Sequence, residues 1–411
     1  MRIVRSTDRR LVDRLIASRP KDDRTFRRRV QAIVDAVRED GDRALHRFAR
    51  RFDGAAPPLE IGKAAIRAGA ARVDTTVRRA LAQAADHIAR VAARQIPPHF
   101  DVRVVPGVTV EQRVEPLRSV GCYVPGGRFP LPSSLLMTAV PAHVAGVREI
   151  VAVCPRPEPV VMAAALEAGV TRLFRVGGAH AIAALAYGTA RVPRVDKIVG
   201  PGNRYVATAK AIVAGDCAID FYAGPTEVLI VAGAGRAGWI AADLVAQAEH
   251  DPDARSVLIT WSRPLAERVS AAVDRISAGR TIVEQSLRAN GAIVVARTDS
   301  EAMELANRFA PEHLVLDRES LARGPIVAGA VFIGEYTAQA AGDYATGSNH
   351  VLPTGGAARA RGGLSAADFM RVMAVQRVTR PGLRRLAEAV VPLARAEGLE
   401  GHAESIEIRL R

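Results

Sequence analysis

The segment DLVAQAEHDPDA places a glutamine and a histidine three residues apart on a predicted helix. Side chains at this spacing share one face of a helix, so the amide oxygen of Gln247 and the imidazole of His250 can reach one metal ion. Most pairs of this kind on helices have no function. The pair therefore indicates a metal site only together with other candidate ligands.

Two further segments carry side chains that can transfer protons or bind a metal. APEHLVLD puts Glu312 beside His313 at the start of a predicted strand, and a neighbouring carboxylate and imidazole can share proton transfers near neutral pH. A polar turn is the alternative explanation of this pair. AGDYATGSNHVLPTGG is a long glycine-rich loop with Asp343 and His350, and both residue types bind zinc.

The segment AEGLEGHAES adds Glu397 and His402 near the C-terminus, although a helix closed by glycine explains this segment equally well. Zinc chemistry needs about four nitrogen or oxygen ligands, plus an open position for substrate. Taken together, the candidates form an oxygen- and imidazole-rich set without cysteine. Such a set favours a catalytic zinc site over a closed structural one.

The bulk composition excludes several classes of protein. With 411 residues, of which 49% are hydrophobic and 24% charged, the chain is predicted to be globular with two or more domains. It lacks both a run of roughly 18 apolar residues and a secretory signal, so we expect a cytoplasmic protein. Cys122, Cys154 and Cys217 form no CxxC pair, which argues against disulfides and against a thiolate zinc site.

The formal charge of +14 raises the question of nucleic-acid binding. The basic residues are almost all arginine and are scattered over the whole length, without a recognisable nucleic-acid-binding module. We therefore expect no nucleic-acid partner.

The elements that must position the candidate residues follow from the apolar pattern. Residues 1–100 are predicted to be helical, because apolar side chains recur at steps of three and four. From about residue 119, short apolar runs alternate with alanine-rich helical stretches in two successive units, which is typical of parallel sheets with crossover helices. The tail from about residue 364 is predicted to be helical and too short for a stable core, so it should pack on the larger part or on a partner chain.

Three glycine-rich loops, at residues 124–127, 176–178 and 200–205, follow predicted strands, where open α/β sheets bind ligands. A fourth loop, GAGRAG at 233–238, matches the dinucleotide-binding pattern GxGxxG. The strand after it, SVLIT, runs into Trp261, Ser262 and Arg263 and lacks the acidic residue expected for the ribose. We therefore predict that NAD does not bind at GAGRAG.

The chain as a whole resembles the histidinol dehydrogenase family. The resemblance extends over essentially the whole length, in the order VREDGDRAL, RFDG, VGCYVPGG, LPSSLLMTAVPA, GPGNRYVATAK, DFYAGPTEVLI, QAEHDPDA, PEHLVL, AGDYATGSNHVLPTGG and AEGLEGH. It implies an NAD-dependent enzyme that oxidises L-histidinol through L-histidinal to L-histidine, with one zinc ion per active site. It also implies an intertwined homodimer.

The resemblance assigns roles to individual residues. Gln247, His250 and Asp343 are the implied metal ligands from one subunit, and His402 comes from the other. His313 would take the hydroxyl proton and Glu312 would activate water for the second oxidation. The implied substrate contacts are Thr226, Gln247, His250, His313, Asp343, His350, Glu397 and His402.

The implied NAD contacts are Tyr123, His180 and Asn203, on three of the glycine-rich loops. The sequence departs from the family at two positions. His180 replaces the usual glutamine, which puts one hydrogen bond to NAD in doubt, and Thr226 replaces a common serine but keeps the hydroxyl group.

The expected fold is α/β, with two Rossmann-like parallel-sheet domains and small helical N- and C-terminal segments. Residues 1–16 are expected to contact the partner subunit, and residues 17–122 with 226–364 to form the first Rossmann-like domain. Residues 123–225 are expected to form the second, NAD-binding domain. Residues 365–411 are expected to form a C-terminal helical segment against the partner.

Two other functions use similar residues. A related zinc- and NAD-dependent dehydrogenase could oxidise another polar alcohol such as a sulfopropanediol, although Glu397 and His350 favour a cationic, imidazole-bearing substrate. A zinc hydrolase also needs a metal, a carboxylate and a histidine. The two Rossmann-like halves with their glycine-rich loops argue against it.

Overall fold

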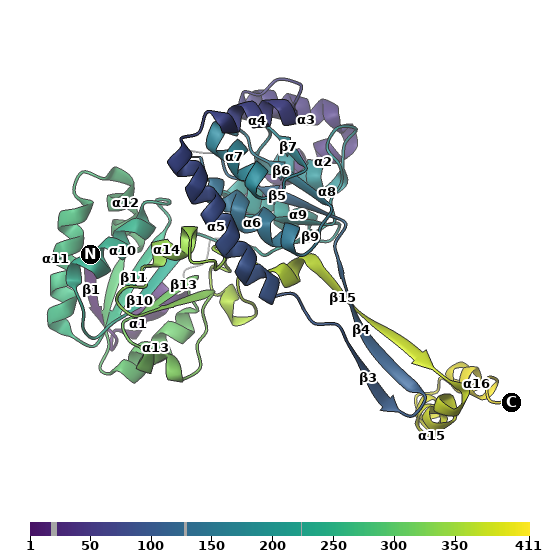
Figure 1. Cartoon of the computed structure of the whole chain (residues 1–411). Coiled ribbons are helices and arrows are strands. Elements are labelled where there is room, and N and C mark those ends of the chain that lie inside the picture. The colour runs from purple at the N-terminus through teal and green to yellow at the C-terminus, as the bar shows by residue number, and fades with distance from the viewer. Residues whose placement is uncertain (18–22, 127–129, 223) are drawn as a thin grey trace.

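The computed structural model describes residues 1–17, 23–126, 130–222 and 224–411. Figure 1 shows two α/β bodies side by side and a long arm that leaves them and carries the C-terminus at its tip. Each body is built on a six-stranded sheet, and the arm on a three-stranded sheet. In the described part of the chain, no helix is both long and apolar enough to cross a membrane.

The sheet of the first body has the strand order β2-β7-β6-β5-β8-β9 and is parallel except for the β2–β7 pair. All five residues of its central strand β5 are buried, as expected for a parallel strand that is covered by helices on both faces. The strands are β2 (Glu60–Ile61), β5 (Ser119–Tyr123), β6 (Glu149–Val153), β7 (Arg172–Phe174), β8 (Lys197–Val199) and β9 (Ala218–Ile219).

Helices cover both faces of this first sheet. Asp23 caps the N-terminus of α2 by accepting a hydrogen bond from Phe26 N at 3.0 Å, and the buried stripe of Val30, Val34 and Val37 packs α2 against α8 and α9. The helices are α2 (Arg24–Asp40), α3 (Asp42–Phe48), the π-helical turn η1 (Ala49–Asp53), α4 (Lys63–Ala71), α5 (Thr75–Arg94), α6 (Pro132–Val144), α7 (Pro159–Glu167), α8 (Gly178–Tyr187) and α9 (Arg204–Val213).

The sheet of the second body is entirely parallel, with the strand order β1-β12-β11-β10-β13-β14. Its strands are β1 (Arg2–Arg5), β10 (Glu227–Val231), β11 (Arg255–Thr260), β12 (Ala292–Val295), β13 (His313–Leu316) and β14 (Ala330–Ile333). Its helices are α1 (Arg9–Ala17), α10 (Ala237–Ala248), α11 (Arg263–Ser277), α12 (Thr281–Asn290), α13 (Asp299–Phe309) and α14 (Gln339–Tyr344), and the 3-10 turn η2 (Glu319–Arg323) follows β13. Helices α10 to α12 pack on one face of the sheet, while α1 and α13 pack on the other.

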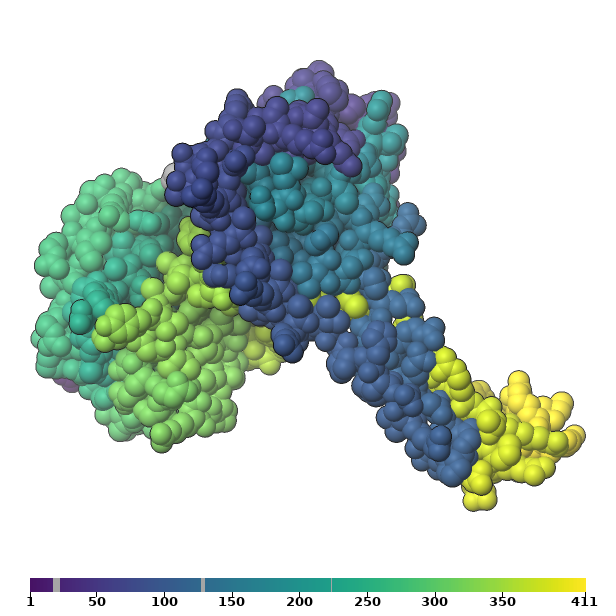
Figure 2. Space-filling model, viewed as in Figure 1, coloured from purple at the N-terminus to yellow at the C-terminus, as the bar shows by residue number. Residues whose placement is uncertain are grey.

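The arm is an antiparallel sheet of order β15-β4-β3, formed by β3 (Phe100–Val105), β4 (Val108–Pro116) and β15 (Met370–Val378). Helices α15 (Arg380–Ala396) and α16 (Glu400–Glu407) lie at its tip. The 3-10 turns η3 (Ala357–Arg359) and η4 (Ala366–Phe369) precede β15. Figure 2 shows that the arm projects well clear of both bodies.

The alternation of strands and helices from residue 119 onward was predicted correctly, and so was the α/β class. The division of the chain differs from the expectation. Helices within residues 24–94 pack on the sheet of residues 119–219 and not on the second sheet, because the stripe on α2 meets α8 and that on α5 meets α6. Strand β1 adds residues 2–5 to the second sheet, and β15 interrupts the tail that was expected to be helical.

Gly200 follows β8 in the left-handed backbone region, with a φ of 115°. A methyl group here would lie 2.3 Å from the carbonyl oxygen of Tyr123. Gly200→Ala should therefore lower the free energy of unfolding by ~2 kcal/mol or more, since a strained φ alone costs ~1–3 kcal/mol. The measurement is urea unfolding.

Gly215→Ala is the matched control, because among the described residues no atom beyond its chain neighbours lies within 4 Å of its added methyl group. It should change the free energy of unfolding by less than ~0.5 kcal/mol. Equal stability of the two variants would contradict the described loop.

Candidate active site

The catalytic candidates gather at one edge of the second sheet, where parallel strands begin. Glu227 starts β10, and His313 starts the neighbouring strand β13 with Glu312 directly before it. Helix α10 runs back from the far edge, so Gln247 at its C-terminal end returns to the strand starts. The site thus lies at the amino edge of this sheet, opposite the carboxyl edge where open α/β sheets usually bind ligands.

A chain of hydrogen bonds fixes the Glu312 carboxylate. Its Oε2 atom accepts bonds from the Thr226 hydroxyl and from the backbone N–H of Glu227, each at 2.7 Å. The same hydroxyl oxygen accepts a bond from Gln247 Nε2 at 2.5 Å. Because the Gln247 amide nitrogen is turned toward Thr226, the amide oxygen points away from it.

His313 is held by one ring nitrogen only. Its Nδ1 lies 3.0 Å from the carbonyl oxygen of Glu227, which requires the proton on Nδ1 because a carbonyl only accepts. Nε2 is buried without a hydrogen-bond partner in the described structure, and it lies 3.5 Å from Asp343 Oδ1. The ring therefore presents Nε2 to the site.

Burial and charge shift the pKa values of these groups. Burial raises the pKa of Glu312 to about 7, although His313 and the hydrogen bonds from Thr226 and Glu227 act in the opposite direction. Burial alone would lower the pKa of His313, but the negative charges of Glu312 and Asp343 outweigh it and raise that pKa to about 9. Near neutral pH the imidazole therefore holds its extra proton unless one of these charges is neutralised.

The loop after β14 brings Asp343 and His350 together. Asp343 Oδ2 accepts a bond from Gln339 Nε2 at 2.7 Å, one turn earlier on α14. The carbonyl oxygen of Asp343 lies 2.8 Å from His350 Nδ1, so the other ring nitrogen of His350 stays available. Burial lowers the pKa of His350, which favours the neutral imidazole.

The same loop also contacts the first body. His87 Nδ1 of α5 lies 2.6 Å from the carbonyl oxygen of Ala345, and Asn349 Nδ2 donates to the carbonyl oxygen of Met137 at 2.6 Å. The segment between Asp343 and His350 is therefore anchored in both bodies. His87 was not among the residues predicted for the site, because it lies among arginines and alanines on an amphipathic helix.

The donor set suits a metal ion. Gln247 Oε1 is buried and without a hydrogen-bond partner in the described structure, and this is an atom that a cation would satisfy. The His250 side chain lies near enough to lower the pKa of Asp343 by its charge. Among the described residues no three His, Cys, Asp or Glu side chains form a metal-binding group. The predicted zinc ligands do not form such a group, because Gln247 is not one of these four residue types and His402 lies at the tip of the arm.

Glu397 and His402 are not brought to the site within one chain. Glu397 ends α15 and His402 lies on α16, and both are exposed at the tip of the arm, far from α10 and α14 (Figure 1). Within one chain of the described structure, this segment therefore supplies no ligand to the site.

The predicted cofactor residues lie at the carboxyl edge of the first sheet. The Tyr123 hydroxyl accepts a bond from Gly178 N at 3.1 Å, and the exposed Asn203 caps α9 through its side-chain oxygen. His180 is only 2% exposed, and its Nε2 lies 2.9 Å from Asp53 Oδ2. Asp53, in the RFDG motif, also accepts from Gly177 N and was missed from the sequence. Gly127 of the first glycine-rich loop lies outside the described residues.

The GAGRAG loop is closed by a carboxylate of the protein itself. Gly233 N and Ala234 N donate to Asp317 Oδ2 at 2.7 and 3.2 Å, so these amides are already paired. A side chain at Gly233 would also collide with the indole of Trp261. The loop follows the carboxyl end of β10, ~15 Å from the catalytic edge at ~3.3 Å per residue. These contacts leave two loop amides already paired, and the absence of NAD from this loop stays a prediction.

We expect Asp343→Asn to lower the pKa of His313 below about 9 in the metal-free protein, because one of the two charges that raise it is removed. The pKa is measured by NMR titration of the His313 ring nitrogens. Asp101→Asn, an exposed position on the arm, is the control. A His313 pKa that stays constant or rises in the Asp343 variant would argue against the 3.5 Å contact.

Comparison with known proteins gives one consistent result. The family model described as histidinol dehydrogenase matches residues 17–410. The chain is 48% identical to the histidinol dehydrogenase of Thermus thermophilus, over 94% of this chain and 95% of that protein. It is 47% identical to that of Syntrophotalea carbinolica, over 93% and 92%.

A crystal structure of histidinol dehydrogenase from Elizabethkingia anophelis has the same fold. The TM-score is 0.95 at 30% sequence identity, and the match covers 100% of this chain and 98% of that one. The motifs, the fold and the relatives agree over the whole length, so the chain belongs to the histidinol dehydrogenase family, whose members are oxidoreductases.

Proposed function

We propose that this protein is a zinc-dependent dehydrogenase that uses NAD to oxidise L-histidinol to L-histidinal and then to L-histidine. The observation that carries the proposal is a pair of buried atoms, Gln247 Oε1 and His313 Nε2, neither of which has a hydrogen-bond partner in the described structure of this family member. Gln247 is joined to Glu312, the neighbour of His313, through the Thr226 hydroxyl. Gln247 Oε1 is suited to bind a metal ion, and His313 Nε2 is suited to exchange a proton.

Zinc would be held by Gln247, His250 and Asp343 of one chain and by His402 of a partner chain, and would bind the substrate's imidazole and amine. The Thr226 hydroxyl turns the amide of Gln247 so that oxygen, the better ligand, faces the site. Gln339 orients the Asp343 carboxylate through its other oxygen. These two contacts prepare the ligands before a metal arrives.

The Glu312–His313 pair supports two proton transfers. Neutralisation of the Asp343 charge lowers the pKa of His313, so Nε2 becomes free to take the hydroxyl proton of the alcohol. Glu312, whose pKa of about 7 lies near neutral pH, is suited to accept a proton from the water that hydrates the aldehyde. Its Oε2 is fixed by two donors, so Oε1 performs this step.

NAD, which accepts the hydride in each oxidation, would bind at Tyr123, His180 and Asn203 on the carboxyl edge of the first sheet. This edge and the catalytic edge of the second sheet are linked by the loop that His87 and Asn349 anchor. The buried Nε2 of His180 is used by Asp53, so Nδ1 is the nitrogen left for the cofactor.

The enzyme would act as a homodimer with shared active sites. The arm exposes apolar side chains that have no cover in one chain, including Phe100, Val102, Val372, Leu393 and Ile408. Such a surface favours a protein partner. Because Glu397 and His402 lie together at the arm's tip, one partner arm would supply both the substrate's ammonium contact and the fourth metal ligand.

Purified protein with zinc should form about two equivalents of NADH per L-histidinol, since each oxidation transfers one hydride. The assay follows NADH absorbance with histidinol limiting. A sulfopropanediol tested in parallel covers the alternative substrate. If the sulfonate is oxidised and histidinol is not, the substrate assignment fails; if neither yields NADH, the dehydrogenase assignment fails.

Thr226→Val should weaken zinc binding about 10- to 100-fold, the usual effect of removing a residue that orients a metal ligand. The variant leaves the Gln247 amide without its hydroxyl partner while keeping the shape of the side chain. Thr226→Ser retains the hydroxyl and should bind zinc as the wild type does. Affinity is measured by competition with a chromophoric chelator, and equal affinities for both variants would refute this role.

Shared sites can be tested by mixing Gln247→Ala and His402→Ala chains. Each variant alone should be inactive, but a purified heterodimer keeps one intact site and should recover about half the wild-type activity. An inactive heterodimer would mean that His402 acts within its own chain, whereas activity of His402→Ala alone would mean that His402 is not needed.

A further inference from the structure

A buried ion pair lies directly behind the catalytic residues. Glu227 and Arg255 are register partners on the adjacent parallel strands β10 and β11. Their side chains are 1% and 6% exposed, and Arg255 Nη1 lies 2.7 Å from Glu227 Oε1. Such a pair is costly to desolvate and persists only where further contacts compensate.

Arg255 makes such further contacts with the N-terminal helix α1 and with α13. Its Nη2 donates to the carbonyl oxygen of Leu15, in the last turn of α1, where helix carbonyls lack internal partners. The guanidinium also lies over the ring of Phe309, 4.3 Å from its centroid, at the end of α13. One side chain thus joins the sheet to both helices on this face.

Glu227 is also the residue that orients the catalytic pair. Its N–H donates to Glu312 at 2.7 Å, and its carbonyl oxygen receives His313 Nδ1 at 3.0 Å. Its carboxylate Oε2 is buried and has no hydrogen-bond partner in the described structure, while Oε1 pairs with Arg255 at 2.7 Å; the backbone N–H groups of Glu312 and Gly355 also lie near this carboxylate.

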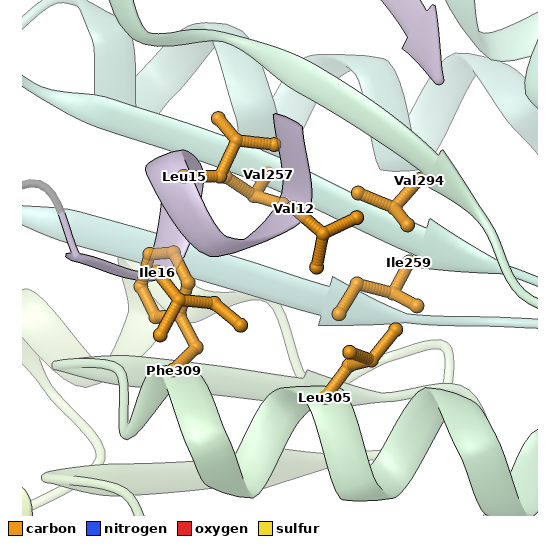
Figure 3. A pocket seen from close by; sticks show the side chains of 8 residues that line it. All are labelled: Val12, Leu15, Ile16, Val257, Ile259, Val294, Leu305 and Phe309. Atoms are coloured by element: carbon orange, nitrogen blue, oxygen red, sulfur yellow. The ribbon is translucent and has the colours of Figure 1, made fainter. Parts of the chain in front are cut away.

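Apolar packing of α1 on the sheet is incomplete. A cavity of about 10 Å³ lies between α1, the sheet and α13, which is room for about one water-sized sphere. Figure 3 shows side chains of α1 turned toward strand residues and toward α13 across this gap; those that line it are Val12, Leu15, Ile16, Val257, Ile259, Val294, Leu305 and Phe309. Because packing leaves a gap, the polar contact at Leu15 is an important anchor of the helix.

We propose that Glu227 and Arg255 are positioning residues that fix the Glu312–His313 pair and couple its geometry to the seating of α1. Both act through other residues: Arg255 lies over Phe309 of α13 and pairs with Glu227, and Glu227 contacts the catalytic pair through its backbone. The proposal rests on the catalytic roles given above for Glu312 and His313.

Arg255→Met is the main test, because it keeps an apolar stem over Phe309 but removes the contacts to Glu227 and Leu15. We expect kcat to fall at least ~10-fold, with KM for histidinol and NAD changed less than ~2-fold, since a misplacement of ~1 Å can cost ~100-fold in rate. Amide exchange in α1 should become faster, and the ring resonances of His313 should shift in the metal-free protein.

Arg308→Met is the matched control. It removes an exposed ion pair of 2.7 Å between Arg308 of α13 and Asp13 of α1, and so loosens the same helix without touching Glu227. We expect kcat and the His313 resonances to stay at wild-type values. If Arg308→Met lowers kcat as much as Arg255→Met, the specific coupling is disproved.

Arg255→Lys and Glu227→Gln extend the test if the methionine variant does not fold. Lysine keeps the charge next to Glu227 and should recover part of kcat, while glutamine keeps the shape and should lower kcat without changing KM. Wild-type kcat in a folded Arg255→Met or Glu227→Gln variant would overturn the proposal. The His313 resonances need no substrate, so this outcome is separable from a wrong substrate assignment.

Discussion

The active site depends on a carboxylate that is buried where two parallel strands begin. Glu312 keeps an orientation there because Thr226 and the Glu227 amide donate to one of its oxygens, and its burial places its pKa near neutrality. The same residues then determine the rest of the site. Thr226 turns the Gln247 amide, and the Glu227 carbonyl fixes the protonated nitrogen of His313.

Under the proposed function, the two bodies would present opposite edges of their sheets to the reaction. The catalytic residues occupy the amino edge of the second sheet, whereas Tyr123, Gly178 and Asn203 lie at the carboxyl edge of the first. The usual rule for open α/β sheets therefore describes the cofactor loops but not the catalytic pair. At the carboxyl edge of the second sheet, the Asp317 carboxylate instead accepts hydrogen bonds from two backbone amides of the GAGRAG loop.

Local sequence patterns predicted the helices and strands better than the long-range contacts between them. The apolar stripes predicted α2 and α5 as helices. They did not predict which sheet each helix covers, because that depends on the contacts of α2 with α8 and of α5 with α6, which lie far along the chain. The spacing of Gln247 and His250 suggested one helix face, but α10 ends at Ala248 and His250 lies exposed just beyond it, so their pairing stays a prediction. The absent acidic residue after SVLIT was sufficient to question GAGRAG. Asp53 and Arg255 could not be found this way, because their partners His180, Leu15 and Glu227 are distant in sequence or on another strand.

The arm explains why assembly and catalysis would be one event under the proposed function. A three-stranded sheet with exposed valines and two terminal helices buries too little apolar surface to be held firmly without a partner. Glu397 and His402 lie on this weakly supported part. Under the proposed function, a partner body that covers the arm would stabilise it and, by the same contact, would receive the metal ligand and the carboxylate that its own chain cannot bring to the site.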